Sequence, residues 1–190
     1  MDKTDAKQSY HFDASRPVLA ILGGSQGSIA LNRHFQNNLE YYSKSNIQIL
    51  WQCGKKDFYE LKELNRHQYI HIIPFTEEMD VFYSAADIIV SRAGALALSE
   101  MALLGKAMVL IPLPHSAGDH QTINAQTFSQ TGGAVLVHQT ALSSGSLEQA
   151  ILELIQNPKK IACMEANSKK NGILDANEKI TTVIMDIAES

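Results

Sequence analysis

The sequence predicts an α/β fold, a doubly wound, Rossmann-like parallel sheet of about six strands with a helical C-terminal tail. Short apolar runs rich in β-branched residues alternate with segments whose apolar residues lie three or four positions apart. Such alternation is typical of parallel strands joined by right-handed helical crossovers, which place helices on both faces of the sheet. After residue 145 the pattern becomes wholly helical, which accounts for the tail.

Six segments are expected to be buried strands, because each is a short apolar run next to a turn signal or a helical pattern. They are residues 17–22, 47–53, 69–75, 87–91, 107–112 and 134–138. The segments between them are expected to be amphipathic helices, as the spacing of Ile29, Phe35 and Leu39 illustrates.

Several helix ends carry local signals. Gly105 and Gly132 each follow a helical segment, where a residue that tolerates positive φ can close the last turn. Ser146 and Gln149 have the spacing of a capping box, which predicts that Ser146 caps the helix LEQAILELI and that Pro158 ends this helix.

Length and composition set the boundaries. With 190 residues, 45% of them hydrophobic, the chain is long enough for one substantial core. We expect residues 17–157 to form the Rossmann-like domain, with a short segment before it at 1–16 and C-terminal helices over 158–190. No apolar run approaches the roughly 20 residues of a membrane helix, and the polar N-terminus does not fit a signal peptide.

Charge and cysteine content exclude some classes of protein. The net charge is −4 and the lysines and arginines are scattered, so the chain lacks the clustered cations of a nucleic-acid-binding protein. Two distant cysteines with no C-x-x-C motif suit a reducing compartment better than a disulfide scaffold.

The loop GGSQG, residues 23–27, directly follows the first predicted strand. It matches neither the G-x-G-x-x-G dinucleotide fingerprint nor a P-loop, which needs a lysine that is absent here. At a helix N-terminus such a loop favours an anion, since glycine lets the backbone approach it closely. A tight strand-to-helix turn without a ligand explains the glycines equally well.

Four predicted strand ends carry glycine or polar residues, namely 23–27, 74–77, 91–95 and 114–121. Ligands of doubly wound sheets bind beyond the carboxyl ends of the strands, so these loops predict one shared site. Glu100 is a candidate for hydrogen bonds to ribose hydroxyls, although a solvated glutamate on a helix face is the simpler interpretation. Phe75 suits either stacking on a base or closing the core.

Residues 115–121 form the most polar of these loops. A metal site at His115, Asp119 and His120 is poorly supported, because the spacing is unusual and further ligands are lacking. Mixed donors and acceptors at His120, Gln121 and Asn124 suit the hydroxyl groups of a sugar, and Asp119 is positioned to cap the following helix.

These segments together resemble the donor-binding half of the GT-B glycosyltransferases, most closely the N-acetylglucosaminyltransferases that complete lipid II in peptidoglycan synthesis. The resemblance runs from about residue 17 to residue 137 and is carried by four segments: GGSQGS, PFTEEMDVFYSAADIIVSRAGALALSE, GKAMVLIPLPHSAGDHQTINA and TGGAVLV. The spacing of SRAGALALSE and DHQTINA makes it specific.

The resemblance implies a UDP-N-acetylglucosamine (UDP-GlcNAc) site. Its residues are Gly24, Ser25, Gln26, Asn32, Phe75, Thr76, Arg92, Ala95, Leu96, Glu100, His120, Gln121 and Asn124. The first three would cradle the diphosphate, mainly through backbone N–H groups. Arg92, Ala95 and Leu96 would shape the nucleotide pocket.

The same resemblance assigns the rest of the donor. Phe75 would lie against the uracil, the backbone of Thr76 would read its edge, and Glu100 would bind the ribose. His120, Gln121 and Asn124 would hold the N-acetylglucosamine. The family needs no metal bound through a D-x-D pair, and no such pair occurs here, so the resemblance implies neither metal nor cofactor.

The resemblance also implies an inverting transfer to a lipid-linked muramyl pentapeptide, in the cytoplasm at the inner face of a bacterial membrane. The resemblance places the acceptor site, most of the peripheral membrane contact and the general base in an N-terminal half, so this chain is expected to be an excised or truncated domain with little activity alone. It also implies that residues 1–16 are an interdomain lead-in and that the helices of 158–190 pack back toward that N-terminal domain. Two alternatives stay open: half of a UDP-GlcNAc 2-epimerase-like enzyme, and the donor-binding subunit of a two-chain glycosyltransferase.

Overall fold

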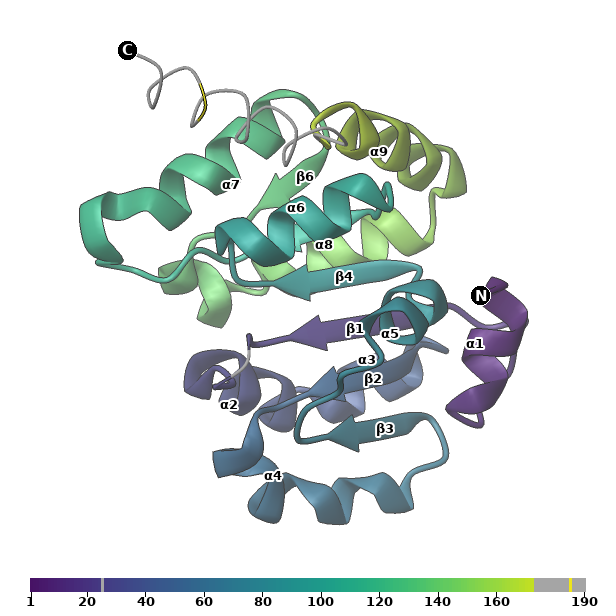
Figure 1. Cartoon of the computed structure of the whole chain (residues 1–190). Coiled ribbons are helices and arrows are strands. Elements are labelled where there is room, and N and C mark those ends of the chain that lie inside the picture. The colour runs from purple at the N-terminus through teal and green to yellow at the C-terminus, as the bar shows by residue number, and fades with distance from the viewer. Residues whose placement is uncertain (25, 173–184, 186–190) are drawn as a thin grey trace.

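The computed structural model describes residues 1–24, 26–172 and Met185. Six parallel strands form one sheet in the order β3-β2-β1-β4-β5-β6, with helices on both faces (Figure 1). The strands are β1 (Val18–Leu22), β2 (Gln48–Gln52), β3 (Ile70–Ile73), β4 (Ile88–Ser91), β5 (Met108–Leu110) and β6 (Ala134–Leu136). The predicted fold class and all six predicted strands are therefore confirmed.

The helices divide between two apolar layers. One layer of buried side chains includes residues from α2 (Ile29–Asn37), α3 (Leu39–Lys44), α4 (Lys55–Leu61), α8 (Ser146–Ile155) and α9 (Pro158–Lys170). The other includes residues from α1 (Lys3–Ser9), α5 (Met79–Ala85), α6 (Ala95–Leu103) and α7 (His120–Gln130). Three 3₁₀ segments complete the order: η1 (Lys62–Arg66), η2 (Ala117–Asp119) and η3 (Gln139–Ser144). The sheet is therefore covered on both faces, as a parallel sheet requires.

The strand order fixes where a ligand can bind. The chain builds outward from β1 to β3, then returns to the other side of β1 with β4. The loops after β1 and β4 therefore leave neighbouring strands in opposite directions, which opens a crevice at the carboxyl ends of the strands.

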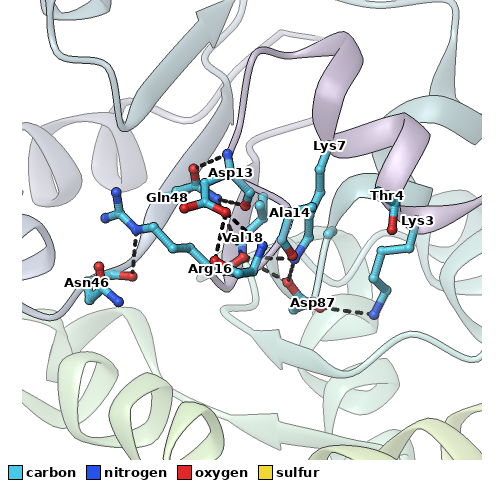
Figure 2. A network of polar contacts seen from close by, with 12 residues as sticks. Lys3, Thr4, Lys7, Asp13, Ala14, Arg16, Val18, Asn46, Gln48 and Asp87 are labelled. Carbon is cyan, nitrogen blue, oxygen red and sulfur yellow. Dashed lines mark hydrogen bonds and ion pairs between the residues drawn. The ribbon is translucent and has the colours of Figure 1, made fainter.

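The N-terminal segment is fastened to the opposite end of the sheet (Figure 2). Lys7 is buried and its Nζ lies 2.7 Å from Asp87 Oδ2, which also accepts from the Val18 N–H at 2.8 Å. Gln48 accepts from the Asp13 N–H and donates to the Asp13 carbonyl, both at 2.8 Å. Residues 1–16, expected as a lead-in, thus hold the amino ends of the central strands.

Two predictions about helix ends need correction. Ser146 does not cap α8: the helix begins after Gly145, which has a left-handed φ of +79°, and Ser146 is its first residue. Pro158 does not end that helix, which already ends at Ile155; it is the first residue of α9, where a missing N–H costs nothing. Gly105 and Gly132 do have the positive φ values expected of them.

The structure describes only part of the expected C-terminal segment, residues 158–190. Of the expected C-terminal segment, α9 packs against α6 and α8, while residues 173–184 and 186–190 lie outside the described residues. No helix within the described ranges combines the length and apolar character that crossing a membrane requires.

Candidate functional site

A cavity of about 950 Å³ lies at the carboxyl ends of β1 and β4. Five residues predicted for the site line it: Gly24, Gln26, Phe75, Arg92 and Gln121. A second cavity, of about 1030 Å³, lies between α2, α3 and α8 on one helical face. We take the first as the candidate site because it occupies the crevice where doubly wound sheets bind ligands.

The glycine loop approaches the next strand so closely that side chains are excluded. A Cβ on Gly27, whose φ is +77°, would lie 2.1 Å from the carbonyl oxygen of Cys53. Gly24 has a φ of +86° with no atom within 4 Å of the Cβ position, so its backbone faces open space in the cavity. Gln26 is exposed beside it, and Ser25 lies outside the described residues.

Two helices begin at this cavity. Ser28 is the N-cap of α2 and accepts from the Leu31 N–H through its hydroxyl at 3.5 Å. Gly94 is the N-cap of α6 and offers no side chain to the first turn. Ala95 and Leu96 are the first two residues of α6, and both are exposed. Free N–H groups and the positive ends of two helix dipoles make this an environment for an anion.

Arg92 adds a positive charge to the same place. Its Nε donates to the Ser28 hydroxyl at 3.1 Å and its Nη1 to the Ile111 carbonyl at 3.0 Å. Burial lowers the pKa of Arg92, but a guanidinium stays charged in proteins. The residue therefore places a fixed cation against the first turn of α2.

A buried glutamine joins the two loops at the other end of the cavity. Gln52 donates to the Gly24 carbonyl at 3.5 Å and accepts from the Thr76 N–H at 3.3 Å. Phe75, next to Thr76, is 42% exposed and lines the cavity, so it does not close the core. The aromatic ring is thereby available to a planar ligand group, and no N–H or O–H group of the described residues donates to the Thr76 carbonyl beside it.

Glu100 lies on α6, about two turns from its start, and is half-buried. The Tyr83 hydroxyl donates to its Oε2 at 2.9 Å, and burial together with this carboxylate raises the pKa of Tyr83. Within the described ranges Oε1 has no hydrogen-bond donor, so one carboxylate oxygen is held while the other is available.

The loop between β5 and α7, with the first residues of α7, contributes polar side chains near the site. Gln121 Oε1 accepts from the backbone N–H groups of Ala93 and Leu113, at 3.3 and 3.0 Å, and within the described ranges its amide hydrogens have no acceptor, so they can meet a ligand. Asn124 donates to the Ala93 carbonyl at 3.1 Å. His120 is exposed, and its Nδ1 contacts the Ala117 carbonyl.

Asp119 does not cap α7 through its side chain. It has a left-handed φ of +53°, and its carboxylate accepts from the Thr122 hydroxyl instead of a backbone N–H. Among the described residues, no three histidine, cysteine or acidic side chains gather as a metal site would require.

Asn32 fastens α2 to the end of β2, where Gly27 also packs against Cys53. It is buried, its amide donates to the Cys53 carbonyl and the Asp57 carboxylate at 2.8 and 2.7 Å, and its oxygen accepts from the Trp51 indole at 3.0 Å. Both amide hydrogens are thus used within the protein.

Among the further residues that line the cavity and that the sequence did not single out, three have long polar side chains. They are Lys55 and Lys56, directly after Gly54, and Gln139, the first residue of η3. The lysines follow the end of β2, so the strand-end rule, if applied to this loop as well, would have found them. Gln139 follows the edge strand β6 and has no local signal in the sequence.

A doubly wound parallel sheet with a cavity at its topological switch point defines the chain as a Rossmann-like α/β domain. The chain belongs to a family described as the glycosyltransferase family 28 C-terminal domain, whose model matches residues 18–180. The resemblance inferred from the glycine and strand-end motifs is therefore confirmed.

Individual relatives narrow the comparison. The chain is 34% identical over 188 residues to UDP-N-acetylglucosamine–N-acetylmuramyl-(pentapeptide) pyrophosphoryl-undecaprenol N-acetylglucosamine transferase of Flavobacterium psychrophilum, covering 99% of this chain and 51% of the relative. It is 37% identical over 171 residues to the protein of the same name in Cytophaga hutchinsonii, covering 90% and 46%. The chain spans about half the length of these relatives.

Solved structures agree with this family. The crystal structure of Acinetobacter baumannii MurG superimposes with a TM-score of 0.79 at 29% identity, covering 90% of this chain and 52% of that chain.

Proposed function

We propose that this chain is the UDP-GlcNAc-binding domain of an inverting N-acetylglucosaminyltransferase that makes lipid II. The observation that carries the proposal is the cavity where the starts of α2 and α6 meet the Arg92 guanidinium, with Phe75 lining the same cavity. An anionic diphosphate fits the first two features, and a base fits the third. The names and coverage of the relatives supply the donor and the acceptor.

Each part of the donor has a place in this proposal. The diphosphate binds the backbone of residues 24–26 near the start of α2, with Arg92 and residues 95–96 shaping the pocket. The uracil lies against Phe75, the free oxygen of Glu100 accepts from the ribose, and His120, Gln121 and Asn124 hold the N-acetylglucosamine. Asn32 fastens α2 to the end of β2 instead of touching the donor, because both its amide hydrogens are engaged.

The Thr76 carbonyl gives the proposal a base preference. The Thr76 N–H already donates to Gln52, so the carbonyl is the backbone group left to meet the base edge. A carbonyl accepts from the protonated N3 of uracil and has no donor to meet at the unprotonated N3 of cytosine. The site should therefore prefer uridine nucleotides to cytidine nucleotides.

The chemistry follows from the leaving group. An acceptor hydroxyl attacks the anomeric carbon, the bond from that carbon to the diphosphate oxygen breaks, and UDP departs with the electron pair. The charge that develops on the diphosphate is stabilised by helix N-termini and Arg92. A general base takes the proton of the hydroxyl; we place this base, the lipid-linked acceptor site and most of a peripheral contact with the inner face of the membrane in a second domain.

Family membership favours this proposal over the two alternatives. The matched family is a glycosyltransferase family, which argues against a 2-epimerase, and two relatives named as transferases are single chains of which this chain covers 51% and 46%, which argues against a two-chain enzyme.

Calorimetric titration of this chain with UDP-GlcNAc, UDP and CDP tests the proposal. We expect UDP-GlcNAc and UDP to bind at millimolar concentration or below, and CDP to bind roughly tenfold more weakly for want of one hydrogen bond. Absence of binding by both uridine nucleotides would refute the donor-domain assignment, whereas equal binding of CDP would refute the role of Thr76.

A further inference from the structure

Every hydrogen-bond partner of Arg92 is electrically neutral. Its guanidinium donates to the Ser28 hydroxyl, to the carbonyls of Ile111 and Pro112, and to Gln139 Oε1. The contact with Gln139 is the shortest of these, at 2.7 Å. In the part of the chain that the structure describes, no carboxylate lies within ion-pair distance of this side chain. The positive charge is therefore oriented without being neutralised.

The surroundings make this arrangement costly without an anion. Arg92 is half-buried, and its Nε reaches the N-cap residue of α2, where the helix dipole is positive. A cation beside a helix N-terminus is repelled by it, and a partly buried charge without a counter-ion loses hydration. A bound anion would relieve both effects at once. The cost in the free protein therefore becomes binding free energy for an anionic ligand.

Gln139 occupies the position where an acid would cancel this charge. It is the first residue of η3, it lines the cavity, and its amide oxygen must face Arg92 because a guanidinium only donates. Glutamate has the same length and would form a charge-assisted hydrogen bond at this place. An amide orients the guanidinium, whereas a carboxylate would orient and neutralise it.

We propose that Gln139 is a positioning residue of the donor site, which fixes Arg92 at the start of α2 while leaving its charge free for the diphosphate. The inference rests on the proposed function and extends it to a residue for which the sequence gives no signal. Gln139→Glu is therefore expected to stabilise the fold and at the same time to weaken donor binding. A glutamine that only supports the local structure would not separate these two effects.

The test compares thermal unfolding and nucleotide affinity of the chain and three variants. Gln139→Glu should raise the unfolding temperature and weaken UDP binding by roughly tenfold or more, because the new carboxylate neutralises the Arg92 charge that the diphosphate would meet. Uridine, which carries no phosphate, should bind the chain and this variant alike in a competition measurement. Gln139→Ala, which frees Arg92 without neutralising it, should lose less UDP affinity and lower the unfolding temperature. Gln8→Glu adds the same charge on the exposed face of α1 and should leave both UDP and uridine binding unchanged.

The outcomes separate the inference from the function beneath it. If the unsubstituted chain binds UDP and Gln139→Glu binds it equally well, the role of Gln139 is wrong while the donor-domain proposal stands. Equal losses for UDP and uridine would also overturn it, since they would show a general disturbance of the pocket. If the unsubstituted chain binds no UDP, the proposed function fails and this inference fails with it.

Discussion

Gly27 and Gly24 belong to one loop, and both have positive φ, but their surroundings differ. A Cβ on Gly27 would overlap the backbone of Cys53, while a Cβ on Gly24 would meet nothing within 4 Å. The first glycine is therefore required by the packing of the loop on β2, and the second only by its backbone conformation. Gly27 thus serves the stability of the loop, whereas Gly24 leaves space for a ligand.

Alanine substitutions at these two glycines should differ in kind. Gly27→Ala combines a steric clash with a left-handed backbone and should lower the free energy of unfolding by about 3 kcal/mol or more. Gly24→Ala carries only the conformational cost, about 1 to 2 kcal/mol, but projects a methyl group beside the cavity and should weaken UDP binding. Denaturant unfolding and calorimetry measure the two effects. Equal destabilisation by both substitutions would contradict the packing argument.

Glu100 provides a residue-level test of the ribose assignment. Glu100→Ala should weaken UDP binding by about 1 to 3 kcal/mol, because a hydrogen-bond acceptor for the ribose is lost. Tyr83→Phe is the matched variant: it removes the hydroxyl that holds Oε2 but leaves the carboxylate, so it should cost less. Unchanged UDP affinity in Glu100→Ala, measured by calorimetry, would exclude this role.

The sequence predicted residues at the site best where a strand-end motif exposes them. Gly24, Arg92 and Gln121 were found this way, and the structure brings them to one cavity. Gln139 was not found, because its contact with Arg92 joins loops 47 positions apart in the chain and no local pattern encodes it.

Among the elements, α1 shows how a segment expected as a lead-in is fixed to the domain. α1 packs on α5, and Ala6 of α1 is buried in the same apolar layer as residues of α5, α6 and α7. The anchor is polar: the Lys7 ammonium contacts Asp87 and donates to the Arg16 carbonyl at 2.8 Å (Figure 2). This end of the sheet is opposite the candidate site, so the anchor should affect stability more than binding.

Replacing each lysine of the anchor should separate buried from exposed ion pairs. Lys7→Met leaves the Asp87 carboxylate without its buried partner and should cost roughly 2 to 4 kcal/mol of unfolding free energy. Lys3, whose side chain is 46% exposed, also contacts Asp87, and Lys3→Met should cost less than about 1 kcal/mol. Chemical denaturation measures both; similar costs would mean that burial does not decide the strength of the pair.

The same anchor should make stability depend on acid. Burial alone would raise the pKa of Asp87, but hydrogen bonds from Lys7 and the Val18 N–H outweigh it, and the pKa lies below its usual value. A lowered folded-state pKa stabilises the fold above the unfolded value, about 3.9, and this stabilisation is lost as the pH falls through the folded-state pKa. Unfolding free energies of the chain and of Asp87→Asn should therefore converge below about pH 4. A constant difference down to about pH 2 would contradict the assignment.

Element boundaries were less predictable than element types. The six strands follow from apolar runs, yet the strand predicted at 107–112 extends only over Met108–Leu110. The start of α8 was misplaced because Gly145 adopts a left-handed conformation that ends η3, and this depends on the preceding turn instead of on the Ser146 to Gln149 spacing.

For the whole molecule, the strand order has the greatest consequence for function. The order β3-β2-β1-β4-β5-β6 brings the loops after β1, β3, β4 and β5 to one side, where the sequence motifs predicted a shared site. The fold class followed from alternation alone, whereas the donor needed specific motifs, because many doubly wound sheets bind different ligands at this crevice. The chain spans about half the length of the relatives it matches, and the acceptor site that we propose is placed outside these residues.

Mapping amide signals of the isotopically labelled chain during titration with UDP-GlcNAc tests the central claim most directly. We expect saturable shifts at residues 23–28, 75–76, 92–96 and 119–124, with Gln139 among the affected positions. The cavity between α2 and α8 serves as an internal control, since it is of similar size and lies on a helical face. Shifts concentrated at residues 142–149, or no shifts at millimolar donor, would contradict a nucleotide-sugar site at the strand ends.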